Sequence, residues 1–289
     1  MPTGRNGPIA ILAGSGRLPI ELVTHLERTR QDHRILAFRG FAARELRRRA
    51  HAIVDLLDLG RILRCLEEWS PAAVTLAGAV HRPSPAALLG AYSLLRNLQE
   101  VRDVISRGDD HVLRGAVSLL EERGHTVVGA HELAPNLTAP SGVLGRHQPA
   151  AEDFASIEAG LLLLQALSPF DVGQATVVAG QRVLAVEGPE GTDRMLRRAR
   201  GIVRGGWLRP ATTGGVLVKI AKKGQDLRVD MPAMGPRTVV EASKSGLRGL
   251  AYGAGTTLLL DQAETIATAD RLGLYLFGIE LEQPSSLPA

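Results

Sequence analysis

The sequence contains little cysteine and few aromatic side chains. One of its 289 residues is a cysteine, Cys65, which excludes an internal disulfide and a zinc site built from several cysteines. Phenylalanine, tryptophan and tyrosine together make up 3% of the chain, too few to line the stacking platforms that bind single-stranded nucleic acid. Cys65 lies on the apolar side of a helical pattern, which predicts a thiol in the core.

Long hydrophobic runs are also missing. The longest, Ala159 to Leu167, is interrupted by Gly160 and Gln165 and is far shorter than the roughly twenty apolar residues of a membrane-spanning helix. Glycines also interrupt the apolar run near the first residue, so we expect no signal peptide. These absences predict a cytoplasmic protein.

Charge of one sign is scarce as well. Lysine and arginine number 34 against 30 aspartates and glutamates, a formal net charge of +4. This weak excess suits anionic small molecules or a phospholipid surface better than tight binding of DNA, so we expect no nucleic-acid partner. A hydrophobic content of 45% and a charged content of 22% exclude wholesale disorder.

The first half of the chain alternates strand and helix patterns. Strand patterns at 8–13, 34–38, 73–80 and 126–130 are separated by segments with helical apolar spacing. One helical segment covers 60–69, and a long one begins after Pro83. Such alternation is typical of a parallel sheet covered on both faces. We therefore predict a Rossmann-like α/β domain over residues 1–134.

The second half begins after a change in composition. Residues 135–149 lose periodicity and gain prolines and glycines, which predicts an interdomain linker. Residues 150–289 then contain patterns that predict an α/β domain with a mixed sheet, and the whole chain is predicted as a two-domain α/β protein. The predicted elements are a helix at 152–167, a hairpin at 175–187, a helix at 193–204, a strand at 215–220 and two further helix–strand alternations that end at Gly278.

A glycine turn follows the first predicted strand. Gly14 and Gly16 precede a helix, where backbone amides and the helix dipole favour a phosphate, so both are candidate substrate-binding residues. Pro19 replaces the third glycine of the dinucleotide fingerprint, and no acidic residue follows the second strand, which disfavours a nicotinamide cofactor. A plain tight turn is the alternative. At the end of the third strand, Arg82 can hold a phosphate through its forked donors.

Two polar segments stand out in the second half. Residues 187–193 carry three carboxylates and a hydroxyl, which suit Mg²⁺ or a sugar; helix capping by Thr192 is the alternative. Residues 219–232 alternate lysine, arginine and aspartate after a strand. Cations beside carboxylates suit a phosphoryl centre, although a charged surface strand would show the same alternation.

Several motifs occur in a fixed order along the chain. They are LAGSGRLP, AGAVHRP, RGDD, GAHE, DVGQ, AVEGPEGTD and GVLVKIAKKGQDLRVDMPAMG. Together they resemble the LpxI family, the UDP-2,3-diacylglucosamine pyrophosphatases of lipid A biosynthesis. The resemblance extends from about Ile9 to Gly278, and EGTD and RVDxPxxG are its most specific parts.

The resemblance implies a reaction and its partners. The family uses Mg²⁺ and hydrolyses the pyrophosphate bond of UDP-2,3-diacylglucosamine, with water directed at the phosphorus nearer the sugar. The products are 2,3-diacylglucosamine 1-phosphate (lipid X) and UMP, and the substrate binds between two domains. A lipid substrate implies peripheral contact with the cytoplasmic face of the inner membrane, for which the basic runs 44–49 and 194–200 are candidates. The oligomeric state stays open, with a homodimer as one option.

The resemblance and the local chemistry together give a set of candidate site residues. Asp230 is the expected catalytic carboxylate, from the Arg-Val-Asp-x-Pro motif, and Ser15 stands where the family has a glycine. Two other interpretations stay open: a nucleotide-sugar or dinucleotide-dependent enzyme of another class, and a non-catalytic nucleotide-binding module. The candidates are Gly14, Gly16, Arg82, Glu190, Thr192, Lys219, Lys222 and Arg228 for substrate, and Asp193, Asp226 and Asp230 for metal.

Overall fold

The computed structural model describes residues 7–80, 109–204 and 214–281. The chain divides into two compact units. The first consists of Met1–Pro135 and Asp226–Asp230, and the second of Asn136–Gln225 and Met231–Ala289. Each unit is described by itself below.

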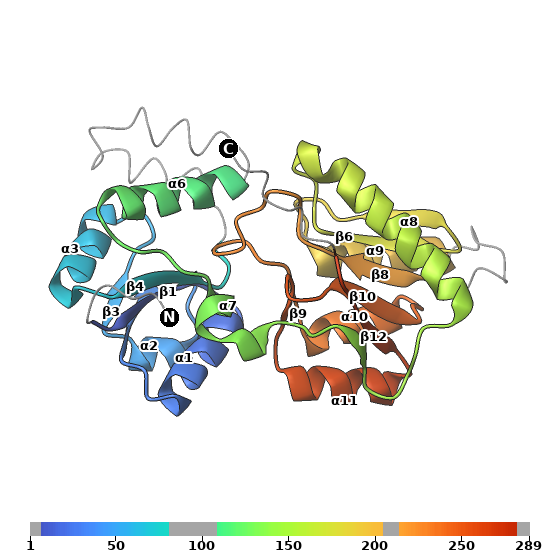
Figure 1. Ribbon diagram of the computed structural model, residues 1–289, viewed down its shortest axis with the longest axis horizontal. Helices are drawn as coiled ribbons and strands as arrows, with labels where there is room; N and C mark the ends of the chain where they lie inside the picture. Colours follow the sequence, from blue (N-terminus) through green and yellow to red (C-terminus); the bar gives the residue numbers. More distant parts are fainter. Residues whose placement is uncertain (1–6, 81–108, 205–213, 282–289) are drawn as a thin grey trace. The chain divides into compact units, whose positions relative to one another are not determined.

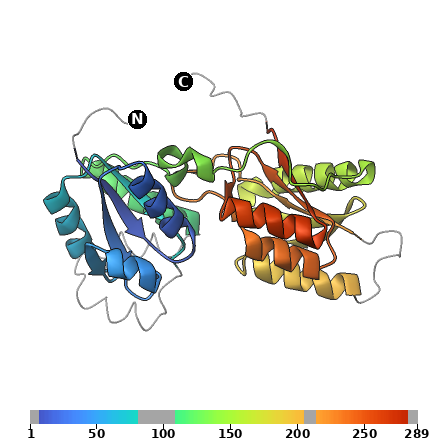
Figure 2. The ribbon, with the colours of Figure 1, turned by 90° about the horizontal axis from the view of Figure 1, so that it is seen from below.

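The first unit is built on a parallel sheet with the strand order β3-β2-β1-β4. Helices α1 and α2 lie on one side of this sheet, and α3 and α6 lie on the other (Figures 1 and 2). The predicted Rossmann-like parallel sheet is confirmed. Its strands are β1 (Ile9–Ala13), β2 (His33–Phe38), β3 (Ala52–Val54) and β4 (Ala73–Ala77), and its helices are α1 (Leu18–Arg28), α2 (Arg44–Arg49), α3 (Leu59–Trp69), α6 (Asp109–Glu122) and α7 (Ala130–Leu133).

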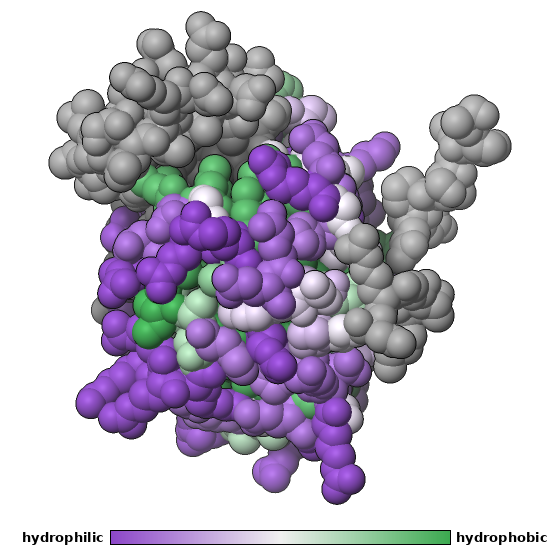
Figure 3. Space-filling model, turned by 90° about the vertical axis from the view of Figure 1, so that its left-hand side faces the viewer, coloured by the Kyte–Doolittle hydropathy of each residue, from purple (hydrophilic) through white to green (hydrophobic). Residues whose placement is uncertain are grey.

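Helix α3 shows why this half folds as the pattern predicts. Asp58 caps it by accepting a hydrogen bond from the Arg61 amide at 3.0 Å. Ile62 and, one turn later, Cys65 and Leu66 are buried in the core against the sheet. The predicted core thiol is thereby confirmed. The face of the unit that carries α3 is mostly hydrophilic, with apolar surface in a few places (Figure 3).

Two parts of the first unit differ from the sequence prediction. The strand expected at 126–130 is reduced to an isolated bridge between Val74 and Val127, because Gly129 already caps α7 and its amide is bound by the Glu132 carboxylate at 2.7 Å. The basic run at 44–49 forms α2 with Leu46 buried, an element that the apolar spacing did not indicate. The long helical region predicted after Pro83 lies outside the described residues except for α6.

The second unit contains the predicted mixed sheet, with the strand order β5-β12-β10-β8-β6-β7. Strands β8, β10 and β12 run parallel, whereas β5 and β6 are antiparallel to their neighbours. The predicted hairpin is formed by β6 and β7. The strands are β5 (Gly142–Leu144), β6 (Ala175–Ala179), β7 (Arg182–Val186), β8 (Val216–Lys219), β10 (Gly249–Gly253) and β12 (Tyr275–Ile279), with a separate pair of β9 (Ala233–Met234) and β11 (Leu258–Leu259).

Helices cover both faces of this sheet (Figure 2). Val216 and Val218 pack toward α8, and Leu217 between them packs toward the other helices, as the two-residue period of a strand requires. Helix α8 approaches β8 closely, since a Cβ at Gly160 would lie 2.6 Å from the Val218 side chain. The helices are α8 (Ala151–Leu167), α9 (Thr192–Arg204), α10 (Pro236–Lys244) and α11 (Gln262–Leu272), with 3-10 turns η1 (Pro135–Leu137) and η2 (Ser168–Phe170).

The segment predicted as a linker, 135–149, is largely part of the second unit. It contains β5, which pairs with β12, and the Ala139 amide donates to the Thr257 carbonyl at 2.8 Å. The chain passes from one unit to the other between Pro135 and Asn136. Among the described helices, none combines the length and the apolar character needed to cross a membrane.

Candidate functional site

The segment that carries the candidate catalytic carboxylate packs on the first unit, although it follows β8 of the second. Asp226–Asp230 belongs to the first unit, and Val229 packs against its core cluster, which includes Val127. The backbone at Gly129 lies so close that an added Cβ would be 3.1 Å from the Arg228 Cα. The GAHE motif at 129–132 and the RVD motif at 228–230 are therefore in contact.

Arg228 connects this segment to itself and to α6. Its Nε and Nη2 donate to the Asp226 carboxylate at 2.9 and 2.7 Å, and its Nη1 donates to the Glu121 carboxylate at 2.7 Å. The Arg228 guanidinium holds the pKa of Asp226 below its ordinary value, although burial acts in the opposite direction. Both residues are thus engaged with protein groups.

Asp230 stands at the end of a tight turn within the same segment. The amides of Val229 and Asp230 both donate to the Asp226 carbonyl, at 3.2 and 3.1 Å. The Asp230 side chain is partly exposed. The Asp226 carbonyl therefore holds the backbone at Asp230, and Arg228 in turn holds the Asp226 side chain. Arg228 and Asp226 thereby position Asp230.

His131 lies beside the same segment and was not predicted as a site residue. Burial lowers its pKa, while the nearby carboxylates of Glu132 and Asp226 act in the opposite direction. Its Nδ1 is buried and makes no hydrogen bond within the described residues. The GAHE motif was the available signal, but a single histidine in a motif does not reveal what surrounds it.

The glycine turn after β1 contacts the end of β4. The Ser15 amide and hydroxyl both donate to the Ala79 carbonyl, at 2.8 and 2.7 Å, and a Cβ at Gly14 would lie 2.7 Å from that oxygen. The Gly14 amide is likewise bound to a β4 carbonyl. These two amides face protein, whereas Gly16 has a φ of +94° and no atom within 4 Å of an added Cβ. Arg82 lies outside the described residues.

A second cluster lies at the carboxyl end of β8 in the second unit. The Lys219 Nζ donates to the Thr192 hydroxyl at 2.8 Å, and that hydroxyl donates to the Glu187 carboxylate at 2.6 Å. The other Glu187 oxygen accepts the Gln174 amide at 3.0 Å. Lys219 and Glu187 are only 7% and 8% exposed. Thr192 therefore joins two buried charged side chains.

Glu190 and Lys222 lie in the same unit and have other partners. Glu190 accepts a hydrogen bond from Arg198 at 2.6 Å, which lowers the pKa of Glu190. Lys222 donates to Asp171, a residue in the left-handed conformation that follows η2. Polar side chains of the DVGQ, EGTD and KIAKK motifs are thus joined by hydrogen bonds within one unit.

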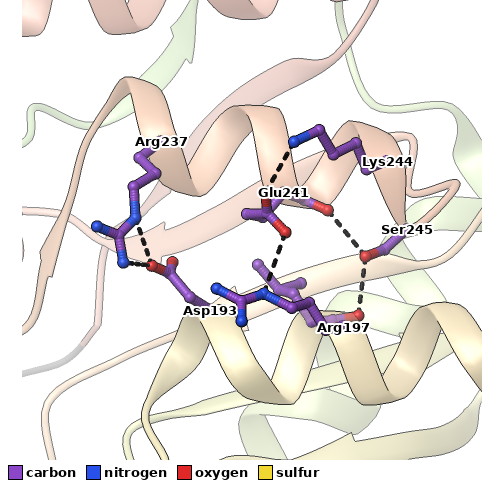
Figure 4. Close-up of polar contacts among 7 residues, drawn as sticks. Asp193, Arg197, Arg237, Glu241, Lys244 and Ser245 are labelled. Atoms are coloured by element: carbon purple, nitrogen blue, oxygen red, sulfur yellow. Dashed lines mark hydrogen bonds and ion pairs between the residues drawn. The ribbon is translucent and has the colours of Figure 1, made fainter.

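Asp193 lies in a seam of polar contacts between α9 and α10 (Figure 4). Arg237 donates to its carboxylate from Nε at 2.6 Å and also from Nη2. Next in the seam, Glu241 pairs with Lys244 at 3.0 Å and with Arg197. Asp193 accordingly joins two helices through an ion pair.

The candidate metal residues are divided between the two units, with Asp193 in the second and Asp226 and Asp230 in the first. Mg²⁺ requires several oxygen ligands around one point. In the described part of the chain, no three His, Cys, Asp or Glu side chains cluster so that they can hold a metal ion, and Asp193 and Asp226 are each bound to an arginine. Neither unit by itself shows a cluster of such ligands within its described residues, and no reaction step below is routed through a metal.

Comparison with known proteins gives consistent matches over both units. The family model described as the LpxI N-terminal domain matches residues 8–137, and that of the LpxI C-terminal domain matches residues 140–277. The UDP-2,3-diacylglucosamine pyrophosphatase LpxI of Caulobacter vibrioides is 36% identical over 278 residues, which cover 95% of this chain and 98% of that protein. The resemblance inferred from the motifs is confirmed, and the chain belongs to the LpxI family.

Proposed function

We propose that this chain hydrolyses the pyrophosphate bond of UDP-2,3-diacylglucosamine in lipid A biosynthesis. The observation that carries the proposal is the 36% identity, over 95% of the chain, to a relative that bears the name of this activity. Water forms a bond to the phosphorus nearer the sugar, and the bond from that phosphorus to the bridging oxygen breaks. Lipid X and UMP are the products, and UMP retains the bridging oxygen.

Lysines of the second unit suit the charge of such a substrate. A diphosphate diester carries two negative charges, which repel an incoming water oxygen, so positive charge must offset them. Lys219 and Lys222 supply two ammonium groups from β8 and the loop after it, and each is held by a protein oxygen. We assign them to the diphosphate, with Thr192 and Glu190 beside them on the EGTD motif.

Asp230 is the proposed catalytic carboxylate. A carboxylate can orient a water molecule and accept its proton as the new bond to phosphorus forms. The turn that Arg228 and Asp226 stabilise fixes where Asp230 leaves the backbone. Arg228 thereby acts on the reaction through Asp230, and Gly16 stays the candidate phosphate contact of the glycine turn.

A magnesium requirement is proposed on the family resemblance. Its test is turnover before and after chelation, followed by addition of Mg²⁺. Restored turnover supports the requirement, and unchanged turnover in chelator contradicts it.

Peripheral contact with the inner membrane is proposed because the substrate carries two acyl chains. Anionic headgroups attract basic residues, and salt screens that attraction. We expect the protein to sediment with anionic vesicles at low salt and to dissociate at high salt. Vesicle binding that is absent at both salt concentrations contradicts this part of the proposal.

A thin-layer assay with UDP-2,3-diacylglucosamine tests the activity itself. We expect lipid X and UMP to accumulate with the wild type. Nucleotide binding without UMP release would favour a non-catalytic nucleotide-binding module. Fluorescence titration with NADPH tests the dinucleotide-dependent alternative. The amides of Gly14 and Ser15 count against that alternative, because both already donate to protein carbonyls.

A further inference from the structure

We propose that Glu187 is a positioning residue that acts through the Thr192 hydroxyl to aim the Lys219 ammonium at the diphosphate of the substrate. This inference rests on the proposed function for the identity of the substrate. Its structural basis is a continuous chain of hydrogen bonds from Glu187 through Thr192 to Lys219, at 2.6 and 2.8 Å. The sequence indicated the carboxylate-rich segment 187–193, but Glu187 was not among the candidate site residues chosen from it.

The direction of every hydrogen bond in this chain follows from the groups involved. A carboxylate can only accept and an ammonium can only donate, whereas a hydroxyl has one proton and two lone pairs. Glu187 therefore accepts a hydrogen bond from the Thr192 hydroxyl, and the oxygen of that hydroxyl accepts one from the Lys219 ammonium. With one acceptor fixed at one point, the Lys219 side chain is held in one orientation.

Lys219 retains donors for a ligand. An ammonium has three N–H groups, and within the described residues Thr192 is its one hydrogen-bond partner. The residue is 7% exposed, and a buried cation without acceptors for its remaining protons is costly. A phosphate oxygen satisfies those donors and balances the charge, which is why an anion fits this position.

Glu187 itself is fixed from two sides. One carboxylate oxygen accepts from Thr192 and the other accepts from the Gln174 amide at 3.0 Å. A glutamine at 187 has a single acceptor oxygen and can satisfy only one of these donors. Glu187→Gln thus preserves the shape of the side chain and removes one of two hydrogen bonds, either that from Thr192 or that from the Gln174 amide.

The experiment uses the full-length protein with four variants and two readouts. Glu187→Gln and Thr192→Val interrupt the chain, and Thr192→Ser preserves its hydroxyl. Glu241→Gln is the matched control, because Glu241 is a glutamate of the same unit that pairs with Lys244 away from this chain. The readouts are KM and kcat on detergent-dispersed UDP-2,3-diacylglucosamine, and the Kd for inorganic pyrophosphate from thermal shifts.

The two interrupting variants should raise KM and weaken pyrophosphate binding about tenfold, as expected for loss of a charge-assisted hydrogen bond, with a smaller change in kcat. Thr192→Ser should restore wild-type values, and Glu241→Gln should lower only the Tm. If Glu187→Gln does not fold, Thr192→Val provides the same test. Wild-type KM and Kd in the interrupting variants would overturn the inference, as would a wild type that binds no pyrophosphate.

The two readouts separate this inference from the proposed function. Pyrophosphate binding that depends on Glu187, in a protein that releases no UMP, would refute the proposed reaction and support the positioning role. UMP release with a KM that is insensitive to Glu187 and Thr192 would support the reaction and refute the positioning role.

Discussion

The two units hold their candidate site residues in different ways. In the first, Arg228 pairs with Asp226 and Glu121, whose side chains are 22% and 45% exposed. In the second, Lys219 and Glu187 are 7% and 8% exposed and are joined through a hydroxyl. Exposed ion pairs contribute about 0–1 kcal/mol, whereas a buried charge that loses its partner costs about 3–5 kcal/mol. Substitutions in the partly exposed ion pairs of the first unit should therefore cost less stability than substitutions in the buried chain of the second.

The largest expected effect comes from removal of the carboxylate carried by the first unit. Asp230→Ala should reduce kcat about 10³-fold, the range of a lost acid–base group, and leave the Kd for UMP within about twofold, because the lysines of the second unit remain. Stopped assays for kcat and thermal shifts for UMP measure the two quantities. The control is Asp58→Ala, which removes the α3 cap and should lower only stability. Undiminished hydrolysis in Asp230→Ala would refute its assignment.

Removal of the buried cation in the second unit should have the next largest effect. Lys219→Met keeps the length of the side chain and loses its charge, so we expect kcat/KM to fall about 100-fold, as for loss of one donor to a developing negative charge. The Tm should fall as well, because the buried Glu187 carboxylate loses the cation to which Thr192 joins it. Lys244→Met, which removes a partner of Glu241 on α10, is the control. Wild-type kcat/KM in Lys219→Met would contradict the comparison.

Weakening the partly exposed ion pairs of Arg228 should have a smaller effect. Arg228→Lys cannot contact two carboxylates with a fork of donors, so the Asp230 turn should loosen and kcat should fall about tenfold with KM unchanged. Glu121→Gln should lower kcat less, since the Asp226 contacts remain. Arg34→Lys, at the exposed pair with Asp32, is the control. A larger loss here than in Lys219→Met would reverse the comparison between the units.

The smallest expected effect is a pH dependence of stability at His131. Burial lowers its pKa from an ordinary value of 6.5, so below about pH 6.5 the unfolded chain binds a proton that the folded chain does not. The free energy of unfolding should therefore fall as the pH falls from 6.5 toward the folded-state pKa. His131→Gln should reduce that slope in urea titrations.

Two other groups set the background of this pH measurement. His51 has a pKa that burial also lowers, so part of the slope should persist in His131→Gln. The pKa of Asp226 is lowered from its ordinary value of 3.8, so its contribution to the free energy of unfolding is lost only as the pH falls below about 3.8. That range lies outside the one in which the histidines titrate. Identical slopes for the wild type and His131→Gln between pH 5 and 6.5 would contradict the burial of a neutral imidazole.

The sequence predicts the main sheets because local periodicity determines them. Strand β1 and helix α3 carry apolar residues at the spacing of their own structures, and the β6–β7 hairpin is local in sequence. By contrast, β5 pairs with β12 across more than a hundred residues and lies in a segment without periodicity. Pairing at such a distance depends on tertiary contacts that no local pattern encodes.

The candidate site could be predicted in part for a similar reason. Polar segments after strands indicated Thr192 and Lys219, and the resemblance to the LpxI family indicated Asp230. The sequence could not separate the buried Glu187 from its more exposed neighbour Glu190, since burial depends on the packing of other segments. It also could not show that the Ser15 amide donates to the Ala79 carbonyl, because that hydrogen bond joins two loops that are far apart in the sequence.

The most direct test of the central claim is hydrolysis of UDP-2,3-diacylglucosamine in ¹⁸O-labelled water, with mass analysis of both products. The account predicts UMP release by the wild type, one ¹⁸O in the phosphate of lipid X and none in UMP. Absence of UMP release would contradict the proposed hydrolysis, and label in UMP would contradict attack at the phosphorus nearer the sugar.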